Sequence, residues 1–280
     1  MKNSKDNTKE NIKGILGTGA IILPNPIYRK VIKHAHRVLD NVDSKIDKSG
    51  LSEENKKIVE KLSKSASDQN TYIGEVNIKH NGFYSPIANK KSPGSKDFIH
   101  LKKEYPASGV VLSHELGHSK HYYGRNGSKI GKIAHDLRSR IGGIESGISE
   151  ISGIRPHELS NAGGTILGLA SGINAGRKEA KGEKEGIVSK TSILAPLAIK
   201  TPQLVSEFEA SRQGMKLLKK AGASKKYRKL AGKSLSGMLG TYAADALIPV
   251  ALGYGARQLG KVVGKEIGRE ELEKKNQEKK

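Results

Sequence analysis

The stretch Gly109 to His118, which reads GVVLSHELGH, decides how the rest of the chain is interpreted. It contains the pattern H-E-x-x-H, formed by His114, Glu115 and His118. On an α-helix, residues four positions apart share one face, so two imidazoles can bind one zinc ion beside a glutamate that acts on a zinc-bound water. The apolar residues ahead of the motif predict a helix with a buried start, and Gly117 lets another backbone or the metal come close. A chance match on an ordinary amphipathic helix is the alternative.

A zinc site of this type needs a third protein ligand, which thermolysin-like zincins take from a glutamate on a later helix. The run Ser206 to Arg212, which reads SEFEASR, opens a predicted helix and offers Glu207 and Glu209. The two are two residues apart, so only one can face the histidines. Ala210 favours Glu207, because a small residue three positions later leaves room beside the metal on the same face. The chain has no cysteine, so a transition-metal site must use histidines and carboxylates.

Composition points to a basic protein with a modest core. The chain has 280 residues, 35% of them hydrophobic and 4% aromatic, and a formal net charge of +22. Length allows one large domain or two small ones. A positive field of this size attracts nucleic acid, anionic lipid or acidic proteins, or simply keeps a lysine-rich protein soluble. The few aromatic residues argue against recognition of single strands by base stacking.

The densest positive run extends from Lys216 to Lys233, where eight basic residues occur without an acid. It is a solvated helix face, a phosphate-binding surface for nucleic acid or lipid headgroups, or a surface that steers acidic peptides. Its candidate anion-binding residues are Lys219, Lys220, Lys225, Lys226, Arg228 and Lys229.

Hydrophobic periodicity predicts an α+β fold, a mostly helical zincin-like domain with a short sheet ahead of the H-E-x-x-H helix. The period of two over Tyr72–Ile78 and Asp97–Leu101 predicts two strands. An edge strand of this sheet can pair with an extended peptide substrate, which makes Phe98, Ile99 and His100 candidate substrate-binding residues. The alternative is a hairpin with only a structural role.

The expected organisation has three parts: a basic N-terminal helical region over residues 1–66, a zincin-like domain over 67–260 and a charged helical tail over 261–280. In the first part, Ile12–Leu23 is apolar but too short to cross a bilayer and lacks a cleavage site, so no convincing signal peptide is found. Helices are predicted over Tyr28–Ile46 and Ser52–Lys64, with Ser52 as N-cap of the second and acids in its first turn.

Apolar stripes interrupted by glycine predict closely packed helices over Arg138–Ile154 and Asn161–Gly176. A charged, exposed connector is expected over Arg177–Glu185. The segment Leu235–Ala256 is long enough to span a membrane. Because Asp245 lies near its centre, we interpret it as a buried helix of the core.

Four blocks of the chain resemble the YugP-like neutral zinc metallopeptidases, and more distantly the HtpX-type membrane peptidases. They are FYSP at Phe83–Pro86 with IHL at Ile99–Leu101, HELGH at His114–His118, EFEASR at Glu207–Arg212, and the Leu239–Leu247 segment with Thr241-Tyr242. The likeness spans roughly residues 70–260. EFEASR is the most specific block, since it extends beyond the expected metal ligands.

The resemblance implies that His114, His118 and Glu207 hold one zinc ion per chain and that Glu115 is the general base. Tyr242, His135 and His157 are candidate donors to the developing oxyanion, and Tyr242 is the one we assign as catalytic. Family members usually begin with a membrane helix and have long apolar segments, whereas this chain has a short N-terminal apolar run and lysines in the later one. It resembles a member that has become soluble or peripheral and strongly basic.

Two hypotheses follow from the sequence. The first is a zinc metallopeptidase that hydrolyses peptide bonds in a peptide or protein substrate. The second is a basic structural or nucleic-acid- or membrane-surface-binding protein, such as a phage virion component, on a zincin fold with vestigial activity. Cytoplasmic, virion-associated and peripheral membrane locations are all compatible with the sequence.

Overall fold

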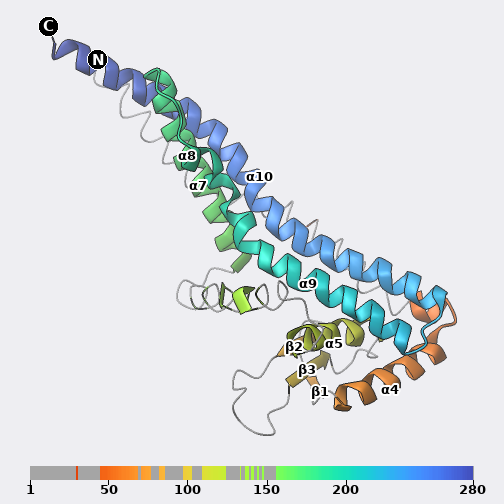
Figure 1. Ribbon diagram of the computed structural model, residues 1–280. Helices are drawn as coiled ribbons and strands as arrows, with labels where there is room; N and C mark the ends of the chain where they lie inside the picture. Colours follow the sequence, from red (N-terminus) through yellow and green to blue (C-terminus); the bar gives the residue numbers. More distant parts are fainter. Residues whose placement is uncertain are drawn as a thin grey trace. The chain divides into compact units, whose positions relative to one another are not determined.

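A computed structural model describes residues 45–68, 71–76, 82–85, 97–102, 109–123 and 156–279, with isolated helical positions at Lys30 and between 133 and 147. The segment Ile12–Leu23 and most of Tyr28–Ile46 and Arg138–Ile154 lie outside these residues. Where described, the chain is mostly helical with one short sheet, which confirms the α+β prediction (Figure 1).

Contacts divide the chain into two compact units. Unit 1 comprises residues 1–31, 140–201 and 243–280, and unit 2 comprises 32–139 and 202–242. This grouping differs from the predicted boundaries at 66/67 and 260/261. The first falls within helix α4 (Ser52–Asp68), and the second within helix α10 (Lys225–Gln277).

Helix α4 forms where it was predicted and runs four residues further. Glu53 and Glu54 occupy its first turn, where the helix dipole stabilises negative charge. The predicted N-cap is wrong, because the carbonyl of Leu51 accepts the first helical hydrogen bond from Asn55 N–H at 2.8 Å. The Ser52 hydroxyl instead donates to Asp47 Oδ1 at 2.6 Å.

The sheet of unit 2 has three strands, β1 (Thr71–Val76), β2 (Gly82–Ser85) and β3 (Asp97–Lys102). Their order is β1-β3-β2, with β1 parallel and β2 antiparallel to β3. The two predicted strands are present, and β2 is a third strand that the periodicity did not predict.

The central position of β3 overturns one prediction. Backbone partners flank Phe98 and Ile99 on both sides, from β1 and from β2. A peptide substrate therefore cannot add to β3 as a new strand, because the hydrogen-bonding groups of its backbone face existing neighbours. The Ile99 side chain is fully buried, whereas Phe98 is 37% exposed and packs edge to face on Tyr72. The side chain of His100 lies outside the described part.

Helix α5 (Gly109–Tyr123) carries the H-E-x-x-H motif and packs into the core of unit 2. Its buried start, predicted from the apolar lead-in, is confirmed at Val110 and Leu112. Asn55 of α4 fixes where α5 begins, since its side-chain oxygen accepts hydrogen bonds from Gly109 N–H at 2.9 Å and from the Tyr227 phenol at 2.5 Å. The core around them holds large apolar side chains, including Ile58, Leu62, Ile99, Leu112, Leu116, Leu217, Leu218 and Leu235.

Unit 1 is built from helices α7 (Pro156–Ala180), α8 (Ile187–Thr191), η2 (Ser192–Leu194), and parts of α9 (Ala195–Lys220) and α10. The helix predicted over Asn161–Gly176 is confirmed and is longer at both ends. Helix α9 begins eleven residues before Ser206 and continues through Pro202, so SEFEASR lies inside a helix and does not open one.

Two further predictions are confirmed only in part. The connector predicted over Arg177–Glu185 begins at Lys181, because residues 177–180 form the last turn of α7. It is largely exposed as predicted, but Glu185 is half-buried and paired with Arg257. The segment Leu235–Ala256 is helical, and Leu235 at its start lies in the core of unit 2. The rest of the segment is not a buried core helix. Only 17% of the most apolar 18-residue window of α10 is buried.

Candidate metal centre

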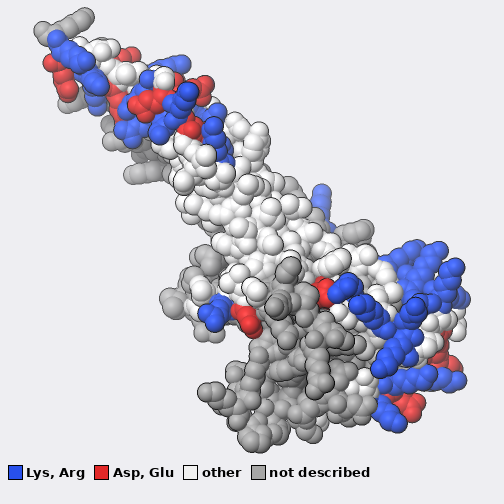
Figure 2. Space-filling model, viewed as in Figure 1, with Lys and Arg blue, Asp and Glu red and all other residues white. Residues whose placement is uncertain are grey.

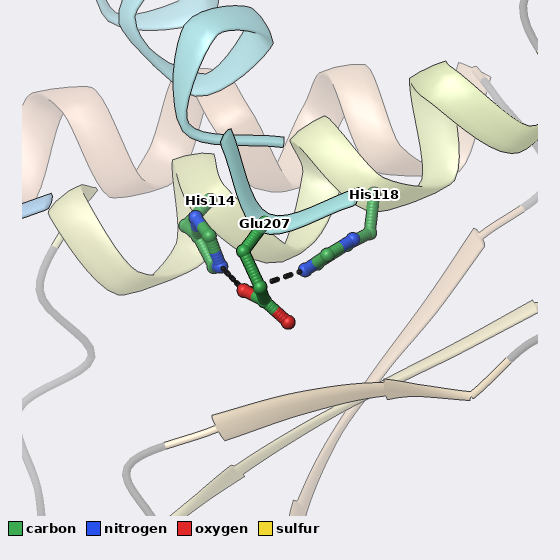
Figure 3. A group of neighbouring side chains, drawn as sticks. All are labelled: His114, His118 and Glu207. Atoms are coloured by element: carbon green, nitrogen blue, oxygen red, sulfur yellow. Dashed lines mark hydrogen bonds and ion pairs between the residues drawn. The ribbon is translucent and has the colours of Figure 1, made fainter. Parts of the chain in front are cut away.

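Three buried side chains converge in unit 2, two from α5 and one from α9 (Figure 3). Glu207 Oε2 lies 3.0 Å from His114 Nε2 and 3.4 Å from His118 Nε2. The imidazoles stand edge to face with ring centroids 4.8 Å apart. Figure 3 shows the carboxylate reaching between the two rings from the neighbouring helix. The structure thus brings together the three residues that the sequence predicted as ligands.

A close helix crossing brings Glu207 to the histidines. A Cβ added at Gly117 would lie 2.1 Å from the carbonyl oxygen of Ala210, so at this point only glycine allows the backbones of α5 and α9 to touch. Gly214 does the same one turn along α9, where an added Cβ would lie 2.8 Å from the carbonyl oxygen of Ser113. The prediction that Gly117 admits another backbone is correct, and the backbone is the one that carries Glu207.

Glu209, the competing ligand candidate, belongs to a different set of contacts. Its Oε2 accepts from Arg212 Nε at 2.9 Å, and its Oε1 accepts from Gln213 Nε2 at 3.0 Å. The two-residue spacing separates the glutamates as expected from helix geometry. Glu207 faces the metal centre, and Glu209 pairs along its own helix.

The site is electrostatically coupled. Burial lowers the pKa of His118 to about 4 against the weaker, opposing pull of Glu207, so this ring is neutral near pH 7. Burial also acts to lower the pKa of His114, but the hydrogen bond to Glu207 and the charges of Glu115 and Glu207 raise it overall. Burial would raise the pKa of Glu207, yet the field of His118 in its protonated form, the positive charge of Arg138 and two histidine hydrogen bonds hold it well below its usual range.

Arg138 is a site residue that the sequence did not identify. Its guanidinium Nη1 lies 2.5 Å from Glu207 Oε1, whereas the other carboxylate oxygen, Oε2, lies against the imidazoles. The carboxylate is therefore held from both sides, with Oε2 on the histidines and Oε1 on the arginine. No motif surrounds Arg138, so pattern alone gave no signal.

The other nitrogen of His114 also has a partner, since Ser211 Oγ lies 3.2 Å from Nδ1. If a metal were bound at Nε2, Nδ1 would carry the proton and donate a hydrogen bond to the serine oxygen, which would fix the tautomer and the ring orientation. Ser211 lies in the EFEASR block, one helical turn after Glu207. A small polar residue at that spacing is a signal from which the sequence could have predicted this contact.

The donor set fits a metal ion. Two imidazole nitrogens and one carboxylate oxygen lie within 4.8 Å of one another, and all three side chains are buried. Ligand atoms bound about 2.1 Å from a tetrahedral metal are about 3.4 Å apart, which is close to the separations between Glu207 and the histidines. The group can therefore hold a metal ion.

Two of the remaining predicted catalytic residues, Glu115 and Tyr242, lie near the ligand group. Glu115 is buried beside His114. Burial lowers the pKa of Arg138, but the field of Glu207, followed by those of Tyr242 and Glu115, raises it above its usual range, which places both groups near the arginine. His135 lies outside the described residues, as does the side chain of His157.

The predicted anion-binding residues form an exposed basic surface on unit 2 (Figure 2). Lys219 and Lys220 end α9, and the others lie in the first turn of α10 or just after it. Five of the six side chains are exposed and Arg228 is half-buried. Lys226 is partly engaged, since its Nζ donates to the carbonyl of Ser49 at 2.7 Å. The sequence run is therefore displayed to solvent as one surface.

No family model, curated protein or solved structure matches this chain. The resemblance to YugP-like peptidases rests on the four sequence blocks alone and stays a hypothesis. What the structure adds is independent of that resemblance: a buried group of His114, His118 and Glu207 that can bind a metal ion.

Proposed function

We propose that the chain is a zinc-dependent metallopeptidase. The observation that supports this most strongly is the convergence of His114, His118 and Glu207 with Glu115 next to the first histidine. Two imidazoles and one carboxylate form a donor set that catalytic zinc takes, with a fourth position open for water. The absence of cysteine also favours hydrolytic zinc chemistry over a closed thiolate site.

Each residue has a role in this proposal. When bound, zinc supplies a water that is nucleophilic near neutral pH and polarises the scissile carbonyl. Glu115 accepts the proton of the attacking water and later delivers it to the leaving amine. Tyr242 donates a hydrogen bond to the carbonyl oxygen as negative charge develops there. Arg138 and Ser211 act on Glu207 and His114, and keep the ligand atoms in position.

The decisive experiment measures metal content and proteolysis in three chains: wild type, Glu115→Gln and the exposed control Glu60→Gln. We expect one zinc per chain in all three after dialysis. Digestion of a peptide library should be retained by the control and reduced at least about 10²-fold in Glu115→Gln, because the proton acceptor is lost. A wild type that retains no metal, or a Glu115→Gln variant that cleaves at the wild-type rate, contradicts the proposal.

A second candidate function is binding of nucleic acid or anionic lipid on the basic surface of unit 2. It is favoured by the exposed lysines of the run from Lys216 to Lys233. Such binding is directed at phosphates and weakens steeply with salt. A titration with duplex DNA at two salt concentrations tests it, and Glu115→Gln should bind as the wild type does.

A further inference from the structure

Unit 1 has its apolar side chains on the outside. Among its described residues, the buried apolar side chains are two alanines and two prolines: Ala175, Pro196, Ala246 and Pro249. Its other large apolar side chains are half-buried or exposed, and the exposed ones are Ile144, Ile166, Leu167, Ile187, Val188, Leu194, Ile199, Leu247, Tyr254, Leu259, Val262 and Ile267. An exposed apolar surface of this extent marks an interaction with a protein or a membrane.

Glycine contacts between α7 and α10 explain this distribution. A Cβ added at Gly164, Gly168 or Gly172 would lie 2.4, 2.0 or 2.2 Å from the backbone oxygens of Pro249, Gly253 and Arg257, respectively. Both series advance by four residues, so the two helices run parallel with their backbones in contact. Interfaces of this kind are enriched in membrane helices, where small residues provide the contact and large apolar residues face lipid.

The exposed apolar residues are spread over all the helices of unit 1. Ile166 on α7 is 62% exposed, Val188 on α8 is 81%, Ile199 on α9 is 47% and Leu247 on α10 is 55%. A folded protein partner would cover one face of a layer of helices. The hydrocarbon of a bilayer would instead surround the whole layer. The distribution therefore favours lipid over a protein partner.

Charge marks one end of the apolar part. The carboxyl ends of α7 and α10 carry interlocking ion pairs, such as Arg177 with Glu271 at 2.7 Å and Lys265 with Glu179 at 2.7 Å. Figure 2 shows an uncharged stretch of surface that stops where these side chains gather. In α10 the apolar part runs from Ala243 to Gly260, and its rise of about 27 Å is close to the thickness of the hydrocarbon layer, about 30 Å.

Two charged side chains of α10 lie within this length, Asp245 and Arg257. Asp245 is half-buried, with its Oδ1 turned away from the surface. Arg257 is neutralised internally. It is only 8% exposed, and its Nη2 donates to both oxygens of Glu185 at 2.6 and 2.8 Å. Its Nη1 donates to the carbonyl of Ser189 at 2.9 Å and to the hydroxyl of Ser171 at 3.2 Å. A charge at membrane depth is tolerated when it faces inward and is paired, as Arg257 is. Lys200 on α9 is also only 8% exposed. The exposed Lys190 on α8 lies five residues after Glu185 of the charged end, where a lysine stem can carry its ammonium group to water.

We propose that the apolar part of unit 1, formed by residues 160–176, 187–201 and 243–260, is embedded in the hydrocarbon layer of a lipid bilayer. The charged end, residues 177–185 and 261–277, lies in water. Helix α10 is long and apolar enough to cross the layer, by length and composition. The proposal does not depend on the metal centre and stands if proteolysis is never detected.

The absence of cysteine makes a direct test possible, because single cysteines can be introduced for labelling. Full-length Ile166→Cys, Leu247→Cys and the control Lys274→Cys are labelled with an environment-sensitive fluorophore and mixed with phosphatidylcholine vesicles. These vesicles carry no net charge, so attraction to the basic surface of unit 2 does not contribute. We expect blue-shifted emission and quenching by spin-labelled acyl chains at the first two positions, and a water-like signal at the control.

Flotation of unlabelled chains supplies the second measurement. Wild type should float with the vesicles in 1 M salt, Leu247→Lys should partition about a hundredfold less, and Val262→Lys, in the charged end, should behave as wild type. Salt-reversible flotation would assign the binding to surface charge and overturn the proposal. Failure to float, with a dimer detected by light scattering, would assign the apolar surface to a second copy and overturn it as well.

Discussion

The two units use apolar residues in opposite ways. Unit 2 buries Ile58, Leu62, Leu112, Leu116 and Leu218 in one cluster, as proteins do in water. Unit 1 places glycine and alanine at its helix contacts and leaves its large apolar side chains exposed. Unit 2 is therefore stabilised by hydrophobic burial, whereas unit 1 depends on backbone proximity between helices. The exposed side chains of unit 1 gain stability only if something other than water covers them.

The two units also differ in how their buried charged side chains are paired. In unit 1, Arg257 and Glu185 satisfy each other with two hydrogen bonds and need no ion. In unit 2, one carboxylate oxygen of Glu207 faces two imidazoles, one of which is neutral near pH 7. The carboxylate of Glu207 and the two ring nitrogens near it form a set of metal ligands. The bidentate pair of Arg257 and Glu185 instead links two structural elements. Charge burial alone thus does not identify a site, but donor type and convergence do.

The largest difference should appear in the free energy of unfolding. Leu218→Ala removes a fully buried side chain from unit 2 and should cost about 2–5 kcal/mol. Leu247→Ala removes a side chain that is 55% exposed in unit 1 and should cost far less in water. Denaturant titration of the two variants beside wild type measures both. Equal losses would show that Leu247 is buried in solution, which contradicts the comparison.

The second effect concerns the helix crossing at the metal centre. Gly117→Ala places a methyl group against the carbonyl of Ala210, so α5 and α9 must separate, at a cost of about 1–3 kcal/mol and with loss of metal binding. Gly240→Ala is the matched control, because no atom lies within 4 Å of the added Cβ, and alanine raises helix propensity by about 1 kcal/mol. Unchanged zinc affinity in Gly117→Ala would mean that the crossing does not position Glu207.

The predictions that succeeded from sequence rest on local periodicity. The i, i+4 spacing placed His114 and His118 on one face, and the i, i+2 spacing separated Glu207 from Glu209. Gly117 and Ala210 were recognised as small residues beside the site, and the structure joins them in one backbone contact. These inferences hold because helix geometry fixes them before any tertiary contact forms.

The failures have tertiary causes. Whether β3 is central or at an edge depends on pairing with β1 and β2, which no single strand encodes. The Leu235–Ala256 segment has the same hydropathy whether it faces a core or lipid, so composition could not show that it is exposed. Arg138 reaches Glu207 from a distant part of the chain, and no spacing rule connects them.

The third prediction tests Arg138 as a positioning residue. Arg138→Ala removes the partner of Glu207 Oε1 and should lower zinc affinity about 10–100-fold, the usual effect of losing an outer-shell contact. Arg138→Lys should recover part of this, since it restores charge without the planar geometry. Arg212→Ala, which removes a pair with Glu209 on the same helix, is the control and should leave zinc affinity unchanged. If Arg138→Ala bound zinc as tightly as the wild type does, Arg138 would not be a positioning residue for Glu207.

The smallest effect is the dependence of metal binding on pH. The pKa of His118 is lowered to about 4, so this ring offers its lone pair across the neutral range, whereas His114, with its pKa raised, retains a proton in the metal-free protein near and just above pH 6.5. Binding must then release one proton from His114, so zinc affinity should fall by up to about tenfold per pH unit as pH drops below that raised pKa.

Calorimetry in two buffers of different ionisation enthalpy counts the protons released by this binding step. One proton between pH 5 and the raised pKa of His114, and a second only near pH 4, would agree with the unequal surroundings of the two rings. Release of two protons together near pH 6 would mean that the rings are equivalent. In that case the contacts of His114 with Glu207 and Ser211 would not distinguish its ring from that of His118, and the asymmetry of the site would lose its physical basis.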